Sequence, residues 1–187
     1  MLSRVSVPVS VRVRARRPSD LGGCFELAQL VKGLDGYPPR GPVDLERFMA
    51  PPQELAAWVA ETDSGVVGHV ALHRTGARVT MAMAAAYTGR SSDRLAVVAR
   101  LFVAPAARRG GAARALLQRA VADAQGRGLQ PVLDVATHFG AAVDLYESCR
   151  WRRAGVVTIE FDDAPSLDCY VYVGPAPSEQ AADITRR

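Results

Sequence analysis

Hydrophobic and polar residues alternate with a period of two along residues 9–15, VSVRVRA. This alternation predicts a β-strand that buries one face and exposes arginines on the other. Two more strand-like runs, residues 54–61 and 66–74, are joined by TDSG, a turn sequence that favours an antiparallel hairpin. Residues 94–103 are mostly apolar, which is typical of a strand buried on both faces.

Helical periodicity is clearest in the segment that follows, where one apolar stripe contains Leu116, Leu117, Ala120, Val121 and Ala124. Shorter helices are predicted over residues 18–32, 44–49 and 141–149, whereas residues 78–89, rich in Ala and Met, do not favour one state. Further strands are predicted over residues 131–136, 151–161 and 167–174. Hairpins combined with one strand–helix–strand unit predict an α/β fold with a mixed sheet.

The chain has 187 residues, of which 49% are hydrophobic, and this amount of apolar sequence suits one domain with a substantial core. We expect residues 1–175 to form that domain and residues 176–187 to form a mobile tail. The net charge of +4 is too small to indicate a nucleic-acid partner. No apolar run reaches the length of a membrane-spanning helix, so no membrane partner is expected.

The cysteines and the N-terminal residues indicate a reducing compartment. Cys24, Cys149 and Cys169 are far apart and have no paired Cys or His at zinc spacing, so we expect reduced thiols and no metal site. The first ten residues, MLSRVSVPVS, are too short and too interrupted to form the apolar core of a signal peptide. A cytoplasmic protein is the expectation.

Residues 104–113 carry the clearest chemical signal, because a buried strand leads into a basic, glycine-containing loop that begins a helix. Arg108 and Arg109 add positive charge, and Gly110 and Gly111 let the backbone approach a ligand closely. Unpaired N–H groups and the helix dipole favour a diphosphate at this place. Taken alone, the two glycines are equally compatible with an ordinary strand-to-helix turn. The chain contains no GxxxxGK[ST] motif.

Arg108, Gly111 and Ala113 match the pattern R/Q-x-x-G-x-G/A, and this segment resembles the GNAT acyltransferase superfamily. Residues 133–151 resemble its fifth strand and the helix that follows. The resemblance implies a mixed, mostly antiparallel central sheet with helices on both faces and a wedge between strands four and five. It also implies that acetyl-CoA is the co-substrate and is held by Leu101, Phe102, Val103, Arg108, Arg109, Gly110, Gly111, Ala112, Ala113 and Arg114.

The same resemblance implies direct transfer of an acetyl group from the thioester to an amine. Tyr146, in the triplet Leu-Tyr-Glu, is the candidate general acid, since a phenol keeps its proton at working pH and can donate it to the sulfur. A tyrosine that only packs in the core is the alternative. Backbone N–H groups near Val103 are the oxyanion donors of the family.

The general base is open between three residues. Asp134 is the first candidate, although a purely structural role for an aspartate at a strand end is about as well supported. His73 is the second candidate, and His69, on the same strand, is a further alternative. Two positions depart from the family pattern. Phe139 stands where an asparagine is usual, and Arg150 stands where a glycine is usual before an aromatic residue.

We expect an N-acetyltransferase that acts on a primary amine of a small molecule or a peptide, as a monomer or a homodimer. A catalytically weak acyl-CoA sensor or accessory domain of the same fold is the alternative, and release of free CoA in the presence of an amine distinguishes the two. A nucleic-acid binder is a third interpretation, but the arginines of VRVRARR and WRR are not interleaved with aromatic residues.

Overall fold

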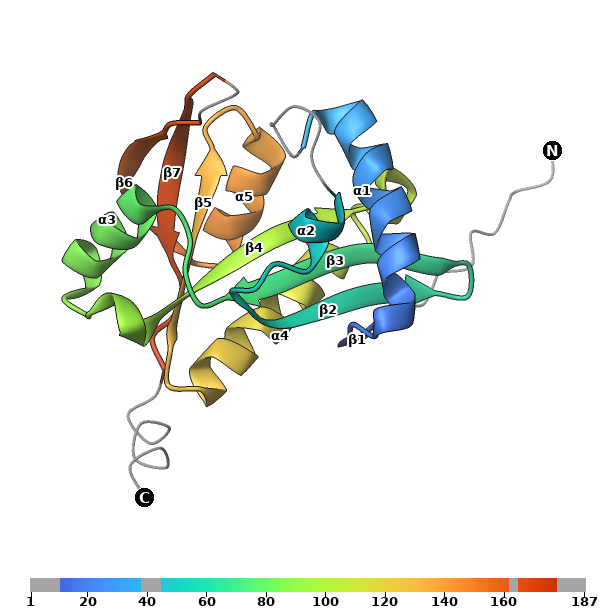
Figure 1. Ribbon diagram of the computed structural model, residues 1–187, viewed down its shortest axis with the longest axis horizontal. Coiled ribbons are helices and arrows are strands. Elements are labelled where there is room, and N and C mark those ends of the chain that lie inside the picture. The colour runs from blue at the N-terminus through green and yellow to red at the C-terminus, as the bar shows by residue number, and fades with distance from the viewer. Residues whose placement is uncertain (1–10, 38–44, 162–164, 178–187) are drawn as a thin grey trace.

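One sheet organises the chain in the computed structural model, which describes residues 11–37, 45–161 and 165–177 (Figure 1). Within these residues the strand order is β1-β2-β3-β4-β5-β7-β6, and all neighbouring strands are antiparallel except β4 and β5. The mixed, mostly antiparallel sheet is therefore confirmed. The strands are β1 (Arg12–Ala15), β2 (Glu54–Thr62), β3 (Gly65–His73), β4 (Leu95–Val103), β5 (Gln130–Ala136), β6 (Arg152–Ile159) and β7 (Leu167–Val173).

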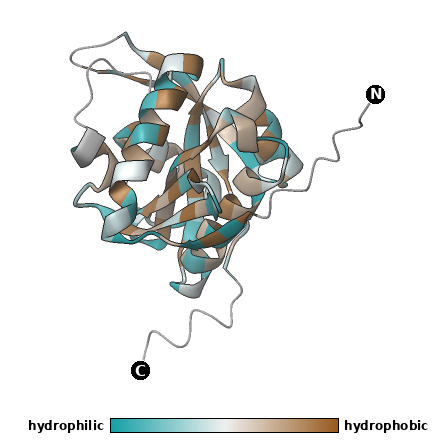
Figure 2. Cartoon of the chain, turned by 90° about the vertical axis from the view of Figure 1, so that its right-hand side faces the viewer, coloured by the Kyte–Doolittle hydropathy of each residue, from teal (hydrophilic) through white to brown (hydrophobic). Residues whose placement is uncertain are grey.

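Helices cover both faces of the sheet, because successive strand residues point to opposite sides and both sides are apolar. On β4, Val97 belongs to a core cluster with α3, whereas Val98 belongs to a cluster with α4 and α5. The helices carry hydrophobic and hydrophilic residues in alternation along their length (Figure 2). The helices are α1 (Leu21–Asp35), α2 (Leu45–Met49), α3 (Arg78–Thr88), α4 (Ala112–Gly126) and α5 (Gly140–Ser148).

The helix boundaries refine the sequence expectations. The predicted helix over residues 18–32 is a 3₁₀ turn, Pro18–Asp20, followed by α1, which ends where Gly36 adopts a left-handed conformation. Residues 78–88, whose state the pattern left open, form α3, with Met81 and Ala84 buried. The predicted start of α2 at residue 44 lies outside the described residues.

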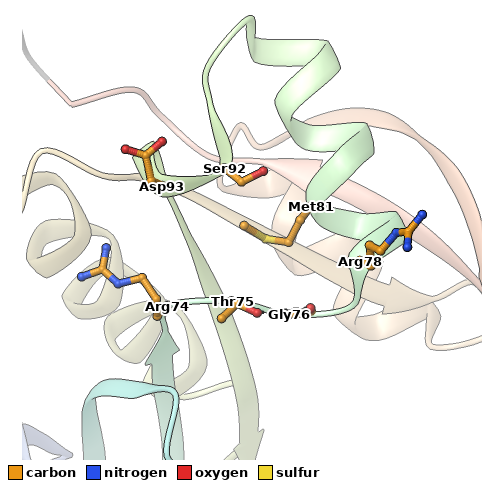
Figure 3. Close-up of a pocket in the computed structure, with 7 residues that line it drawn as sticks. All are labelled: Arg74, Thr75, Gly76, Arg78, Met81, Ser92 and Asp93. Atoms are coloured by element: carbon orange, nitrogen blue, oxygen red, sulfur yellow. Dashed lines mark hydrogen bonds between the residues drawn. The ribbon is translucent and has the colours of Figure 1, made fainter.

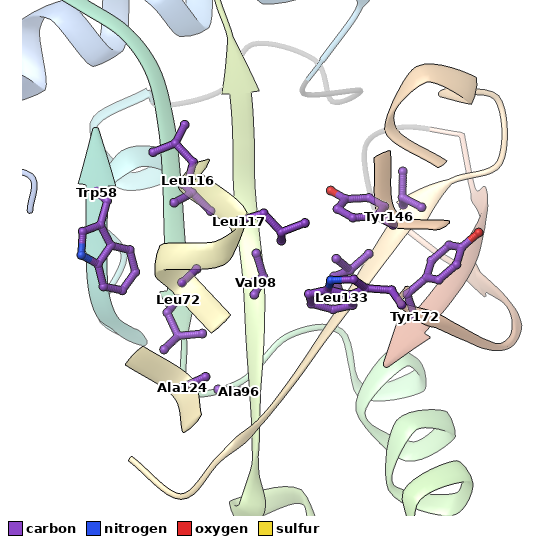
Figure 4. Packing of buried hydrophobic residues seen from close by; sticks show 14 of the residues in the cluster. Trp58, Leu72, Ala96, Val98, Leu116, Leu117, Ala124, Leu133, Tyr146 and Tyr172 are labelled. Carbon is purple, nitrogen blue, oxygen red and sulfur yellow. The ribbon is translucent and has the colours of Figure 1, made fainter. Parts of the chain in front are cut away.

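The two parallel strands of the sheet separate along their length. β4 pairs with β5 only over Leu95–Val97, opposite Gln130–Val132, although β4 continues to Val103 and β5 continues to Ala136. Side chains from α4 and α5, including Leu117 and Tyr146, belong to the core cluster beside these strands (Figure 4). This divergence is the predicted wedge between strands four and five.

A β-bulge lies within β4, shortly before the wedge reaches its open end. His69 and Ala71 of β3 are opposite Phe102 and Ala99 of β4, so β4 contains one more residue than β3 between these pairs. Arg100 takes up this extra length in a left-handed conformation, with φ of 54°. The bulge changes the direction of the backbone at the point where β4 leaves β5.

Within the described ranges, none of the helices is long and apolar enough to cross a membrane. The described residues end at 177. Just before this point, the carbonyl oxygens of Pro175 and Ala176 accept hydrogen bonds from the Gln125 side chain of α4, at 3.3 and 3.1 Å. Residues 178–187 of the predicted tail lie outside the described residues.

Candidate active site

The glycine loop predicted to bind a diphosphate is exposed and leads directly into α4. Pro105–Ala107 form a 3₁₀ turn, and Arg109 and Gly111 then adopt left-handed conformations, with φ of 63° and 84°. Gly111 is the N-cap of α4 and provides no side chain to cap it. Within the described residues, the backbone N–H groups of residues 111–114 form no hydrogen bond. The loop therefore presents several free donors at the positive end of a helix dipole.

Two arginines of this region hold the loop and the neighbouring helices in place. The Arg108 guanidinium donates to the carbonyl oxygen of Val103 at 3.1 Å and forms an ion pair with Asp35 at the end of α1. Arg114, in the first turn of α4, donates to Ser148 Oγ at 2.9 Å and to Cys149 Sγ at 3.2 Å. These contacts tie the loop to α1 and the start of α4 to the end of α5.

The backbone of Val103 faces the wedge. The N–H group of the next residue, Ala104, donates to the carbonyl oxygen of Val67 across the β3 side of the strand, at 2.8 Å. Because consecutive N–H groups of a strand point to opposite edges, the N–H group of Val103 points to the β5 side. At this point β5 has already left β4.

Tyr146 lies in α5 with its ring buried among Trp151 and Tyr172, whose ring centroids are each 5.9 Å away. Its hydroxyl lies on the side of the ring that faces β4 (Figure 4). Burial raises the pKa of this hydroxyl, and the nearby Tyr37 and Asp134 raise it further. The phenol is therefore protonated at neutral pH.

Asp134 lies on β5, and its carboxylate accepts a hydrogen bond from the Thr80 hydroxyl of α3 at 2.8 Å. Partial burial raises the pKa of this carboxyl, although the Thr80 hydrogen bond opposes that effect. Asp134 also acts electrostatically on the Tyr37 and Tyr146 hydroxyls. The Asp134 side chain therefore faces α3, whereas its neighbours on β5, Leu133 and Val135, pack in the core cluster that contains Tyr146.

The two histidines of β3 are buried beside two arginines. His73 lies against Arg100, with Nη1 2.5 Å from its Nε2, and His69 lies between Nη1 of Arg16 at 3.1 Å and the carbonyl oxygen of Arg100 at 3.0 Å. Burial lowers the pKa of each ring to about 3, and the positive charges of Arg16 and Arg100 lower it further. Both rings are therefore neutral, and proton uptake by either is opposed.

Sequence reasoning did not single out the group that surrounds these histidines. Arg16 pairs with Glu54 at 2.7 Å, and the guanidinium of Arg100 lies 4.5 Å from the centre of the Phe48 ring. Burial raises the pKa of Tyr37 to about 12. One signal was available in the sequence, namely a single arginine, Arg100, in the middle of the apolar run 95–103.

The two family departures have visible consequences. Phe139 packs edge-on against the Tyr37 ring, with centroids 6.1 Å apart, in place of the hydrogen bond that an asparagine offers. Arg150 has φ of 62°, the left-handed conformation that a glycine adopts without strain.

Two surface cavities lie away from this site. One, of about 380 Å³, is bordered by the end of β3, the start of α3 and the turn at Ser92 and Asp93 (Figure 3). Arg74 and Asp93 lie on one side of it, and Arg78 and Met81 lie on the other. A second, of about 480 Å³, is lined in part by three arginines, Arg90, Arg150 and Arg152. No residue predicted for the active site lines either cavity.

Known structures have the same fold. The ribosomal-protein-S18-alanine N-acetyltransferase from Escherichia coli is 16% identical, with a TM-score of 0.64 over 90% of this chain and 96% of that chain. NAA60 from Arabidopsis thaliana in complex with acetyl-CoA is 20% identical, with a TM-score of 0.66 over 88% and 97%. The yncA protein from Salmonella typhimurium with its cofactor acetyl-CoA is 16% identical, with a TM-score of 0.67 over 90% and 95%.

No curated protein matches the chain. Residues 25–150, more than half of the chain, match the sequence model of the family described as Acetyltransferase (GNAT) family. This range contains the glycine loop, both parallel strands of the wedge and Tyr146. The chain therefore belongs to the GNAT acetyltransferase family.

Proposed function

We propose that this protein is an acetyl-CoA-dependent N-acetyltransferase that acetylates a primary amine of a small molecule or a peptide. The observation that carries the proposal is the divergence of β4 from β5 next to a loop whose N–H groups at residues 111–114 have no partner within the described residues. A strand pair that separates beside free donors suits a ligand with an extended arm and a diphosphate.

The residues present fit such a ligand. The backbone N–H groups of residues 109–114 would hold the diphosphate, because they have no partner within the described residues and an added Cβ at Gly111 meets no atom within 4 Å. The N–H group of Arg108 already donates to the carbonyl oxygen of Pro105, at 3.3 Å. Leu101 and Phe102 precede this loop on β4, beside the wedge. Arg109 and Arg114 are exposed near the same helix start and add positive charge.

Acetyl-CoA, when bound, supplies an acetyl group activated as a thioester. The protein must then remove a proton from the acceptor ammonium, stabilise a negative oxygen and return a proton to the departing sulfur. We assign stabilisation of the oxyanion to the Val103 N–H group, which points to the β5 side. We assign donation of the proton to the sulfur to the Tyr146 hydroxyl. Asp134, whose burial raises its carboxyl pKa, is the first candidate base. His73 is the second, although Arg100 already contacts its Nε2.

Two measurements test the function. The melting temperature is expected to rise with acetyl-CoA and not with NAD or ATP, by roughly 5–10 °C at a hundredfold excess over Kd. A thiol reagent is expected to detect free CoA when an amine is added. Binding of acetyl-CoA without thiol release from any amine supports the sensor alternative, and a shift with NAD or ATP alone contradicts the proposal.

A glycine variant tests the loop. Gly111→Ala is expected to weaken acetyl-CoA binding at least tenfold, because an alanine at φ of 84° strains the backbone that presents the donors. Gly128→Ala is the matched control, since Gly128 has φ of 69°, open surroundings and a place beyond the opposite end of α4. Both variants are expected to lose about 1–2 kcal/mol of stability. Equal acetyl-CoA affinity in the two variants, measured by calorimetry, contradicts the assignment of the loop.

A further inference from the structure

We propose that Arg100 binds a carboxylate of the acceptor, so that the acetylated amine belongs to an amino acid or a related amino-carboxylic acid. The inference rests on the proposed function, because it names the substrate class of the same site. It is carried by a partly buried guanidinium that has no anionic partner in the described part of the chain.

The guanidinium of Arg100 is only partly satisfied. Its Nη1 is in contact with His73, and its face lies over the Phe48 ring. Its Nε is shielded from solvent and has no hydrogen-bond partner, and Nη2 forms no hydrogen bond with the described residues. The Nε and Nη2 donors form the side-on fork with which arginine binds a carboxylate through two parallel hydrogen bonds. This fork is the part of Arg100 left without an acceptor.

The charges around Arg100 do not balance. Arg16 and Arg100 are positive, and the neighbouring His69 and His73 are neutral because burial lowers the pKa of each. Glu54 is the one described carboxylate that interacts with this group: its Oε1 pairs with Arg16 at 2.7 Å, and its buried Oε2 has no hydrogen-bond partner within the described residues. One positive charge therefore remains. A partly buried cation of this kind is costly unless an anion pairs with it, and an acceptor carboxylate supplies one.

The position of Arg100 suits recognition of the acceptor. The side chain leaves the bulge of β4, on the sheet face that also carries α1, α2 and α3. Tyr37 connects it to the helix of Tyr146, because its ring centroid lies 6.4 Å from that of Phe48, which Arg100 covers, and 6.1 Å from that of Phe139, the N-cap of α5. A ligand that places its carboxylate at Arg100 can therefore direct its ammonium towards the side of Asp134 and Tyr146. The distance between the carboxylate and the ammonium of the ligand distinguishes α-, β- and γ-amino acids as acceptors.

Paired acceptors test the proposal. Glycine, β-alanine and γ-aminobutyrate are compared with their amides, which keep the amine and lose the negative charge. The wild-type protein is expected to show a kcat/KM at least tenfold higher for an acid than for its amide. Arg100→Gln is expected to abolish this preference by lowering kcat/KM for the acids alone. Arg100→Lys is expected to keep part of the preference. Arg119→Gln, on α4, is the control and is expected to keep the full ratio.

Binding measurements separate this proposal from the proposed function. With CoA present, N-acetylglycine is expected to bind more tightly than N-acetylglycinamide, and Arg100→Gln is expected to remove the difference. This result without any acetyl transfer supports the carboxylate site and contradicts the transferase. Equal use and equal binding of acids and amides by the wild-type protein overturns the carboxylate site, whether or not transfer occurs. The comparison uses the wild-type protein and Arg100→Lys if Arg100→Gln does not fold.

Discussion

Tyr146 shows how the surroundings of one residue decide what it can do. Its ring packs against Trp151 and Tyr172, and burial together with the nearby Tyr37 and Asp134 raises the pKa of its hydroxyl. A phenol in this position keeps its proton and can donate it. Tyr172 of the same cluster differs, because its hydroxyl donates to Glu147 at 2.8 Å and is already committed. Within this aromatic group, Tyr146 is therefore the candidate acid.

The Tyr146→Phe variant tests that role. Loss of the hydroxyl is expected to lower kcat at least tenfold with little change in acetyl-CoA affinity, since general acid catalysis typically contributes about 10²–10⁴-fold. Steady-state kinetics and calorimetry measure the two quantities. Tyr170→Phe is the control, because the Tyr170 hydroxyl forms no hydrogen bond with the described residues and its ring contacts to Arg153 and Tyr172 persist. A kcat unchanged by Tyr146→Phe contradicts the assignment.

Residues in motifs can be proposed for the site from the sequence, whereas residues defined by long-range contacts cannot. Tyr146 and the glycine loop stand in short patterns with fixed spacing, and the structure places them beside the same wedge. Arg100 becomes noticeable only when the fold places Phe48 over it and His73 beside it. Glu54 is a similar case, because its partner Arg16 is far from it in sequence.

At the scale of elements, one close contact sets the height of α4 above the sheet. Gly68 of β3 lies under the helix, and an added Cβ there would be 3.0 Å from Leu116 Cδ1 and 3.2 Å from both Ala60 and Val103. Contacts this short leave no room for a side chain. The N-terminal part of α4, which follows the glycine loop, can therefore lie directly on β3 and β4.

Gly68→Val tests this dependence. The larger side chain is expected to push Leu116 and the start of α4 away from the sheet, to cost about 1–3 kcal/mol of stability and to weaken acetyl-CoA binding. Urea unfolding and calorimetry measure the two effects. Gly33→Ala in α1 meets no atom within 4 Å and is expected to stabilise the protein by about 0.5–1 kcal/mol with no change in binding. Unchanged acetyl-CoA affinity in Gly68→Val shows that the loop does not depend on this contact.

Element types followed from periodicity more readily than element order. The period-two runs predicted the hairpin of β2 and β3, and the apolar stripe predicted α4. The helix α3 was not resolved by its pattern, because Ala and Met pack equally well in several settings and its burial against β4, β5 and β7 is a tertiary effect. Likewise, β7 lies between β5 and β6, an order that only pairing distant in sequence establishes.

At the scale of the whole molecule, one otherwise apolar face of the sheet contains a group of buried polar side chains. Clusters around α1 with α2, and around α3, occupy the same face, and His69, His73 and Arg100 lie between them. Each histidine has a pKa lowered to about 3, first by burial and then by the neighbouring arginines. The folded chain therefore excludes two protons that the unfolded chain binds below pH of about 6.5.

This difference makes the protein less stable in acid. As the pH falls from about 6.5 towards 3, each excluded proton lowers the free energy of unfolding by about 1.4 kcal/mol per pH unit. His73→Gln is expected to reduce the slope by that amount, whereas His138→Gln, which alters an exposed ring, is expected to leave it unchanged. Urea unfolding from pH of about 6 to 4.5 measures the slope. Glu54 and Asp134, whose raised pKa values act in the opposite direction, are common to all three proteins and cancel from the comparison. Equal slopes in the wild type and His73→Gln would mean that His73 is protonated inside the fold.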